Sequence, residues 1–170
     1  MIRDVRLSDA KSITEIYNHY INNTIITFED KPIDASETQR RITKVHKKGY
    51  PYIVLEEDGV LIGYAYVDNW RERVAYDITL ETSIYLEHSY IGRGAGTALY
   101  RELVNRSREI GIHSLIGVIS LPNDESLKLH KKTGFKRVGT FEKVGFTGTL
   151  FLFGDSVNTL IDVDFWQLIL

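Results

Sequence analysis

The chain contains, at residues 84–97, the stretch Ile-Tyr-Leu-Glu-His-Ser-Tyr-Ile-Gly-Arg-Gly-Ala-Gly-Thr. Its first residues are apolar and β-branched or aromatic, which is typical of a buried strand. Three glycines follow at alternate positions and lead into residues with helical spacing. Glycine lets backbone N–H groups approach an anion closely, and a helix N-terminus attracts negative charge. The stretch therefore predicts strand, turn and helix around a pyrophosphate site. A plain turn, the alternative, would need only one glycine.

Two common phosphate sites fit this stretch poorly. A Walker A loop needs Gly-Lys-Ser/Thr, and the chain has no such tripeptide. A dinucleotide fingerprint needs a third glycine where Thr97 stands, and it belongs near the first strand of an alternating β/α fold. Here several strands precede the turn. ATP and NAD are therefore disfavoured as ligands.

Over the rest of the chain, hydrophobic spacing and end signals predict a mixed α/β domain, with helices packed on a twisted central sheet. A first helix begins after Ser8 or Asp9 and continues to Ile21, and residues 24–28 form a loop or a strand fragment. Further helices are expected at residues 34–48, 94–110 and 123–133. Strands are expected at residues 2–7, 52–55, 61–67, 76–86, 114–119, 136–144 and 163–170. No linker divides the chain, so a single domain is expected over residues 1–170.

Composition excludes several classes of function. The chain of 170 residues has a formal net charge of −2, whereas proteins that grip nucleic acid usually show a marked basic excess. It has no cysteine, so disulfides, thiolate metal sites and a cysteine nucleophile are excluded. No apolar run reaches the ~20 residues that span a bilayer. Because the N-terminal segment is charged, no secretory signal is expected. A cytoplasmic location is expected instead.

A second stretch, at residues 123–135, reads Asn-Asp-Glu-Ser-Leu-Lys-Leu-His-Lys-Lys-Thr-Gly-Phe. Glycine turn, helix, strand and this segment together resemble the GCN5-related N-acetyltransferases (GNAT). The phosphinothricin and methionine sulfoximine acetyltransferases of that superfamily look similar over nearly the whole chain. The resemblance is carried by Asn18-His19-Tyr20-Ile21, Glu81-Thr82-Ser83-Ile84-Tyr85, Leu121-Pro122-Asn123-Asp124 and Phe165-Trp166-Gln167-Leu168. It implies a GNAT fold, acetyl-CoA as cosubstrate, transfer to the α-amine of a small amino-acid-like acceptor, and a homodimer.

The resemblance also implies where acetyl-CoA binds. The glycine turn would hold the pyrophosphate, and Asn123, in addition to capping its helix, would bond the pantetheine arm. Main-chain groups of Ile84 and Leu86 would pair with that arm as if it were another strand. The implied set is Ile84, Tyr85, Leu86, Gly92, Arg93, Gly94, Ala95, Gly96, Thr97, Asn123 and Ser126.

Two residues are candidates for acid–base catalysis. Glu81 stands among apolar residues in the predicted strand before the turn, and partial burial raises a carboxyl pKa toward that of a useful base. Alternatively, it belongs to a solvated strand face shared with Thr79 and Ser83. His130 occupies the helix position from which, by resemblance, a side chain assists departure of the CoA thiolate; a surface histidine is the alternative. The other histidines have no ligand spacing, so no metal site is expected.

Four residues are candidates for acceptor binding. Arg71 and Arg73 point the same way on an extended segment and can clamp a carboxylate, although charge runs are usually solvated. Phe28 and Tyr76 are candidates for the wall of the acceptor site, or else belong to the core.

The sequence departs from the subgroup pattern at two places. Ile91 stands where the glycine turn usually begins with Arg or Gln, and Arg93 could compensate. The connection at residues 147–161 is longer than usual and apolar in part. Two other functions therefore stay open: acetylation of a protein N-terminus or a polyamine, and acyl-CoA binding without catalysis. A polyamine site should be acidic, which the two arginines oppose.

Overall fold

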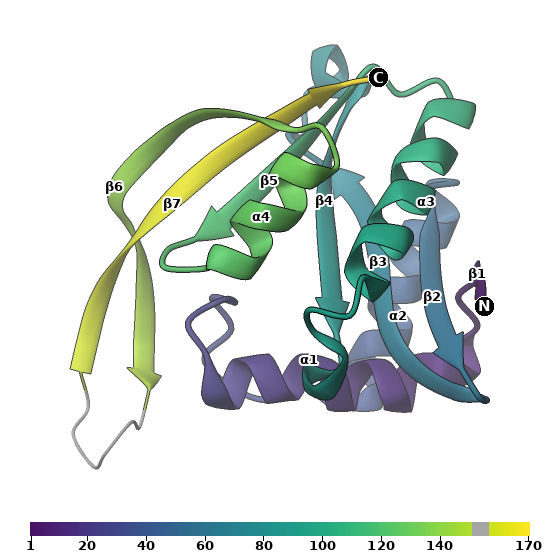
Figure 1. The fold of residues 1–170 in the computed structure, drawn as a ribbon, viewed down its shortest axis with the longest axis horizontal. Coiled ribbons are helices and arrows are strands. Elements are labelled where there is room, and N and C mark those ends of the chain that lie inside the picture. The colour runs from purple at the N-terminus through teal and green to yellow at the C-terminus, as the bar shows by residue number, and fades with distance from the viewer. Residues whose placement is uncertain (151–156) are drawn as a thin grey trace.

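The computed structural model describes residues 1–150 and 157–170. Four helices and seven strands form the described fold (Figure 1). The helices are α1 (Ala10–Asn23), α2 (Ala35–Lys47), α3 (Ala95–Glu109) and α4 (Asp124–Lys132). The strands are β1 (Ile2–Asp4), β2 (Tyr52–Glu57), β3 (Val60–Asn69), β4 (Thr79–Leu86), β5 (Ser114–Ser120), β6 (Lys136–Leu150) and β7 (Val157–Ile169).

The strands form one mixed sheet in the order β1-β2-β3-β4-β5-β7-β6. Only the central pair, β4 and β5, is parallel, and the other neighbours are antiparallel. The first hairpin closes at Asp58 and Gly59, which both have positive φ, as tight hairpin turns require. The mixed α/β architecture expected from the sequence is confirmed.

Helices cover both faces of the sheet. Successive strand residues point to opposite sides, so each strand contributes to both cores. Val54 and Tyr64 pack in one core with α1 and α2. Their chain neighbours Ile53 and Ala65 pack in the other core, which contains Leu99 of α3. The β6–β7 hairpin extends away from these two layers (Figure 1).

Several predicted boundaries are wrong. The first strand ends at Asp4 rather than at residue 7, because a 3₁₀ turn (Leu7–Asp9) intervenes before α1. The strand predicted from Tyr76 begins only at Thr79, and Tyr76 ends another 3₁₀ turn (Val74–Tyr76). The last two strands are longer than expected. Part of the predicted long connection, residues 151–156, lies outside the described residues.

Candidate active site

A cleft of about 460 Å³ opens between β4 and β5. The two strands are paired only from Thr79↔Ser114 to Thr82↔Gly117, although β4 continues to Leu86 and β5 to Ser120. Beyond Thr82 they diverge, and the cleft is lined by the end of β4, the end of β5, α4, the glycine turn and the loop after α1.

Main-chain groups of β4 face this gap. Glu87 N donates to Ile62 O, so these two residues form a hydrogen-bonded pair. Tyr64↔Tyr85 lies two pairs further along the β3–β4 ladder and is therefore of the same kind. Hydrogen-bonded and non-bonded pairs alternate in an antiparallel ladder, so the N–H and C=O groups of Ile84 and Leu86 point away from β3. The Leu86 carbonyl accepts a hydrogen bond from the Tyr20 hydroxyl at 2.7 Å. The gap is thus bordered by an open strand edge.

The glycines of the turn serve two purposes. Gly92 and Gly94 have φ values of 82° and 88°, which side chains rarely tolerate. Gly96 leaves room for packing, because a Cβ there would lie 3.1 Å from a methyl group of Leu86. The amides of Thr97 and Ala98 both donate to Gly94 O, whereas the preceding amides of the first turn of α3 have no acceptor within the helix. The Ala95 and Gly96 amides are therefore available to bind an anion beside the cleft.

The start of α4 forms the opposite wall. Asn123 caps the helix, since its Oδ1 accepts from Ser126 N at 3.2 Å. One helical turn further, the His130 ring is only 4% exposed. Its Nδ1 lies 2.8 Å from the Ser126 carbonyl oxygen, which only accepts, so Nδ1 carries the proton. Burial lowers the pKa of His130 to about 4, and the ring is therefore neutral at pH 7.

A buried hydrogen-bonded chain continues from His130. The Tyr100 hydroxyl lies 2.9 Å from His130 Nε2 and donates to it, because that nitrogen has no proton. Thr82 Oγ1 lies 2.6 Å from the Tyr100 oxygen. Gly117 leaves space for the ring: a Cβ there would lie 2.3 Å from His130 Nε2. These hydrogen bonds join β4, α3 and α4 at the base of the cleft.

Glu81 also lines the cleft, and it lies near the end of the part of β4 that pairs with β5. Burial raises the pKa of Glu81, the Asp68 carboxylate adds to the rise, and Arg71 opposes it. Asp68 is its cross-strand partner on β3, so both side chains lie on the same face of the sheet. Lys44 of α2 and Lys48, the residue that follows the helix, both pair with Asp68. A half-buried carboxylate with a raised pKa suits a general base.

The structure brings most of the predicted site residues to one cleft. Its lining includes Phe28, Glu81, Ile84, Tyr85, Leu86, Gly92, Gly94, Gly96, Thr97, Asn123, Ser126 and His130.

Five predicted residues lie elsewhere. Arg93 and Ala95 line a neighbouring hollow, and the Arg93 guanidinium lies over the Tyr90 ring. Arg71, Arg73 and Tyr76 are in the exposed segment after β3, outside the cleft lining. The compensation for Ile91 by Arg93 therefore has no support in this conformation.

Sequence reasoning missed several cleft residues. Lys128 and Lys132 of α4 line it, as does Glu125, which pairs with Lys128 at 3.1 Å; the i, i+4 spacing of the two lysines on the helix after Asn123 was a usable signal. Tyr20 also lines it, from a helix far away in the sequence. No local pattern could have identified Tyr20.

No cluster of three or more metal-ligating side chains occurs within residues 1–150 and 157–170. In the same part of the chain, no helix has the length and apolar character needed to cross a membrane.

Comparisons with known proteins agree on one family. A family model described as an acetyltransferase (GNAT) domain matches residues 2–149. The phosphinothricin N-acetyltransferase of Alcaligenes faecalis is 38% identical over 161 residues, 94% of this chain and 79% of that protein. The L-methionine sulfoximine/L-methionine sulfone acetyltransferase of Salmonella typhimurium is 33% identical over 144 residues, 85% of this chain and 84% of that protein.

A solved structure gives the same result. The crystal structure of a GNAT superfamily phosphinothricin acetyltransferase from Sinorhizobium meliloti, in complex with AcCoA, matches with a TM-score of 0.88 and 37% identity. The match covers 100% of this chain and 88% of that one. With its divergent central strands, its glycine turn and these similarities, the chain belongs to the GNAT family of acetyltransferases.

Proposed function

We propose that the protein transfers an acetyl group from acetyl-CoA to the α-amine of a small amino-acid-like acceptor, such as phosphinothricin, methionine sulfoximine or a related metabolite. The observation that carries the proposal is the single cleft that joins the open edge of β4, the glycine turn and Glu81. The names of the phosphinothricin and methionine sulfoximine acetyltransferases among its relatives support the same acceptor class.

The residues around the cleft fit acetyl-CoA. The main-chain groups of Ile84 and the N–H of Leu86, which point into the gap, suit the amide-containing pantetheine arm, and Asn123 and Ser126 lie across the gap. The unpaired amides at the start of α3 suit a pyrophosphate, since a helix N-terminus favours an anion. Lys132 adds a cationic group to the cleft lining, whereas Lys128 is paired with Glu125.

The chemistry needs a neutral amine, a stabilised oxyanion and a leaving thiolate. Glu81, directly or through a water, takes the proton from the acceptor ammonium, and the amine attacks the thioester carbonyl. An N–H group near Leu86 donates to the oxyanion, and the C–S bond breaks as the C–N bond is kept. The second proton, which the nitrogen loses as it becomes an amide, passes to the departing thiolate and gives CoA–SH. His130 is not the proton donor in this step, because its pKa of about 4 leaves little imidazolium at pH 7 and both ring nitrogens are hydrogen-bonded within the protein; its part is to hold Ser126 and Tyr100 in place at the base of the cleft. No covalent acyl-enzyme is required.

Four residues are proposed for the acceptor. Phe28 lines the cleft, whereas Arg71, Arg73 and Tyr76 are carried by the exposed segment after β3. Arg71 lies close enough to Glu81 to oppose the rise in its pKa. A cationic group beside the base favours an acceptor that carries a carboxylate and disfavours a polyamine.

We also propose that residues 1–170 form one domain and that the protein is a cytoplasmic homodimer. Dimerisation is supported by exposed apolar side chains on the projecting hairpin: Val138, Phe141, Val144, Phe146 and Leu160.

The test measures CoA release from acetyl-CoA with a panel of amino acids, phosphinothricin, methionine sulfoximine and a polyamine. We expect turnover with the amino-acid-like amines only. We expect Glu81→Gln to lower kcat by about 100-fold, within the usual range for loss of a general base, with acetyl-CoA binding changed less than about twofold. Acetyl-CoA binding without turnover on any amine would indicate a sensor, and unchanged kcat in Glu81→Gln would remove that residue from the mechanism.

A further inference from the structure

We propose that Arg41 is a positioning residue for the acceptor side of the cleft: its guanidinium holds the loop between α1 and α2 so that Phe28 stays in the cleft wall. The proposal rests on the proposed function, because it assigns this loop to the acceptor rather than to acetyl-CoA.

The loop of residues 24–34 reaches the cleft without a helix or strand of its own. Ile26, Thr27 and Phe28 line the same cleft as Glu81. Such a segment keeps one conformation only where contacts offset the entropy lost on ordering. The contacts that fix it therefore decide the shape of this wall.

The end of the loop farther from the cleft is fixed by Asn18. The Asn18 amide donates to Ile33 O at 2.8 Å, and Ile33 N donates to Asn18 Oδ1 at 2.9 Å. The part that lines the cleft has longer hydrogen bonds among its anchors, including one from the Tyr17 hydroxyl to Glu29 Oε1 at 3.4 Å. The hydroxyls of Tyr17 and Thr27 lie 2.9 Å apart, and Ser120 Oγ donates to Ile26 O at 3.4 Å, a long hydrogen bond.

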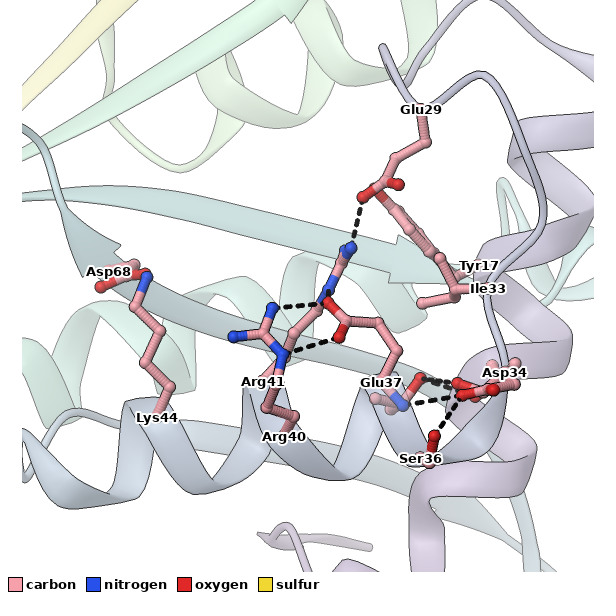
Figure 2. Close-up of polar contacts among 12 residues, drawn as sticks. Tyr17, Glu29, Ile33, Asp34, Ser36, Glu37, Arg40, Arg41, Lys44 and Asp68 are labelled. Carbon is pink, nitrogen blue, oxygen red and sulfur yellow. Dashed lines mark hydrogen bonds and ion pairs between the residues drawn. The ribbon is translucent and has the colours of Figure 1, made fainter.

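Arg41 supplies the strongest anchor next to Phe28. Its Nη2 donates to Glu29 Oε1 at 2.6 Å, and its Nε donates to Glu37 Oε1 at 2.7 Å (Figure 2). Its guanidinium carbon lies 5.7 Å from the centre of the Tyr17 ring. One side chain of α2 is thus tied to its own helix, to α1 and to the loop, and charge-assisted hydrogen bonds are the strong ones.

Phe28 itself has little burial to hold it. Its side chain is 46% exposed, and it lies directly against the β6 backbone at Gly145, where a Cβ would come within 2.5 Å of the ring. The ring is therefore held on one side by Gly145 and through the backbone by the adjacent Glu29–Arg41 pair. Because partly exposed ion pairs contribute little to global stability, the effect of this pair falls on position rather than on folding.

The experiment compares Arg41→Met with Arg40→Met. Arg40 is a matched control on the same helix: it donates to Glu37 at 2.7 and 2.8 Å, and its described contacts do not include Glu29. We expect Arg41→Met to raise the acceptor KM by about tenfold, since small misplacement of a positioning contact is costly. Its kcat at saturating acceptor and its acetyl-CoA KM should change less than twofold. Arg40→Met should match the wild type in all three constants.

Two further measurements separate positioning from general structure. Amide hydrogen exchange at residues 26–30 should accelerate in Arg41→Met and not in Arg40→Met. Glu29→Gln should reproduce the effect, and the double variant Glu29→Gln/Arg41→Met should be no worse than either single one. An unchanged acceptor KM, or a parallel loss of kcat, acetyl-CoA affinity and thermal stability, would overturn the proposal. A wild-type protein without any transferase activity would instead overturn the proposed function.

Discussion

Burial decides how His130 behaves. In the sequence it is a histidine on a polar helix, and its ordinary pKa predicts titration near neutrality. In the structure, Tyr100 contacts it from another helix and Gly117 leaves the space it fills. Neither contact is visible in local spacing. The type and position of His130 could therefore be predicted, but its charge state could not.

This charge state makes stability depend on pH. The pKa of His130 is about 4 in the folded protein and 6.5 in an unfolded chain, so between these values mainly the unfolded state binds the proton. Stability is therefore full above pH 6.5 and falls as the pH is lowered. Between pH 7 and pH 5 the loss from this residue is about 2 kcal/mol. Urea unfolding at both pH values measures it.

His130→Asn serves as the control for that measurement. Its stability at pH 7 is expected to be lower, because a packed, hydrogen-bonded ring is removed. Its free energy of unfolding should nevertheless change less between pH 7 and pH 5 than that of the wild type. Identical pH dependence in the two proteins would contradict a buried neutral histidine.

At the scale of elements, capping residues and periodicity predicted the helices well. Asn123 caps α4 as expected, and Gly111, with positive φ, follows the end of α3, whereas Asp9 precedes α1 without a side-chain capping hydrogen bond. The start of β4 was predicted too early. Residues 76–78 look like a continuation of the strand, but in the structure they are exposed and precede the first pairing with β5. Pairing between distant segments, rather than propensity, decides that boundary.

The pairing of β3 with β4 yields a prediction for the base. Asp68 faces Glu81 across the two strands and helps raise its pKa. Since Glu81 must be deprotonated to act as base, its pKa sets the acid limb of the profile of kcat/KM against pH. Asp68→Asn removes a negative charge, so the limb should move to lower pH. Lys44→Met removes a charge that compensates Asp68, so the limb should move to higher pH.

The opposite signs make this pair of variants a strict test. A nonspecific disturbance of the sheet would shift both profiles in the same direction or lower both rates without a shift. Movement of both limbs in one direction would show that the Asp68 charge does not reach the group that titrates in catalysis.

At the scale of the whole molecule, the cleft exists because one sheet divides between β4 and β5. The glycine turn could be predicted from local sequence, since three nearby glycines determine its conformation. The divergence could not, because it depends on pairing between segments more than thirty residues apart that stops after Thr82. The family resemblance supplied the fold as an expectation; the wall contributed by Tyr20 and the loop after α1 emerged only from the assembled structure.

A ligand that fills the divergence should stabilise the entire domain. If acetyl-CoA pairs with the open edge of β4 and contacts α4, binding is linked to folding, and at 100 times its Kd the gain is about 2.7 kcal/mol. For a chain of this size that corresponds to a rise in Tm of about 5–10 °C. Exchange of the Ile84 and Leu86 amides should slow at the same time. ADP, which lacks the pantetheine arm, should leave those two amides unchanged. A rise in Tm without protection of Ile84 and Leu86 would mean that acetyl-CoA binds elsewhere, and the open edge of β4 would then lose its proposed role.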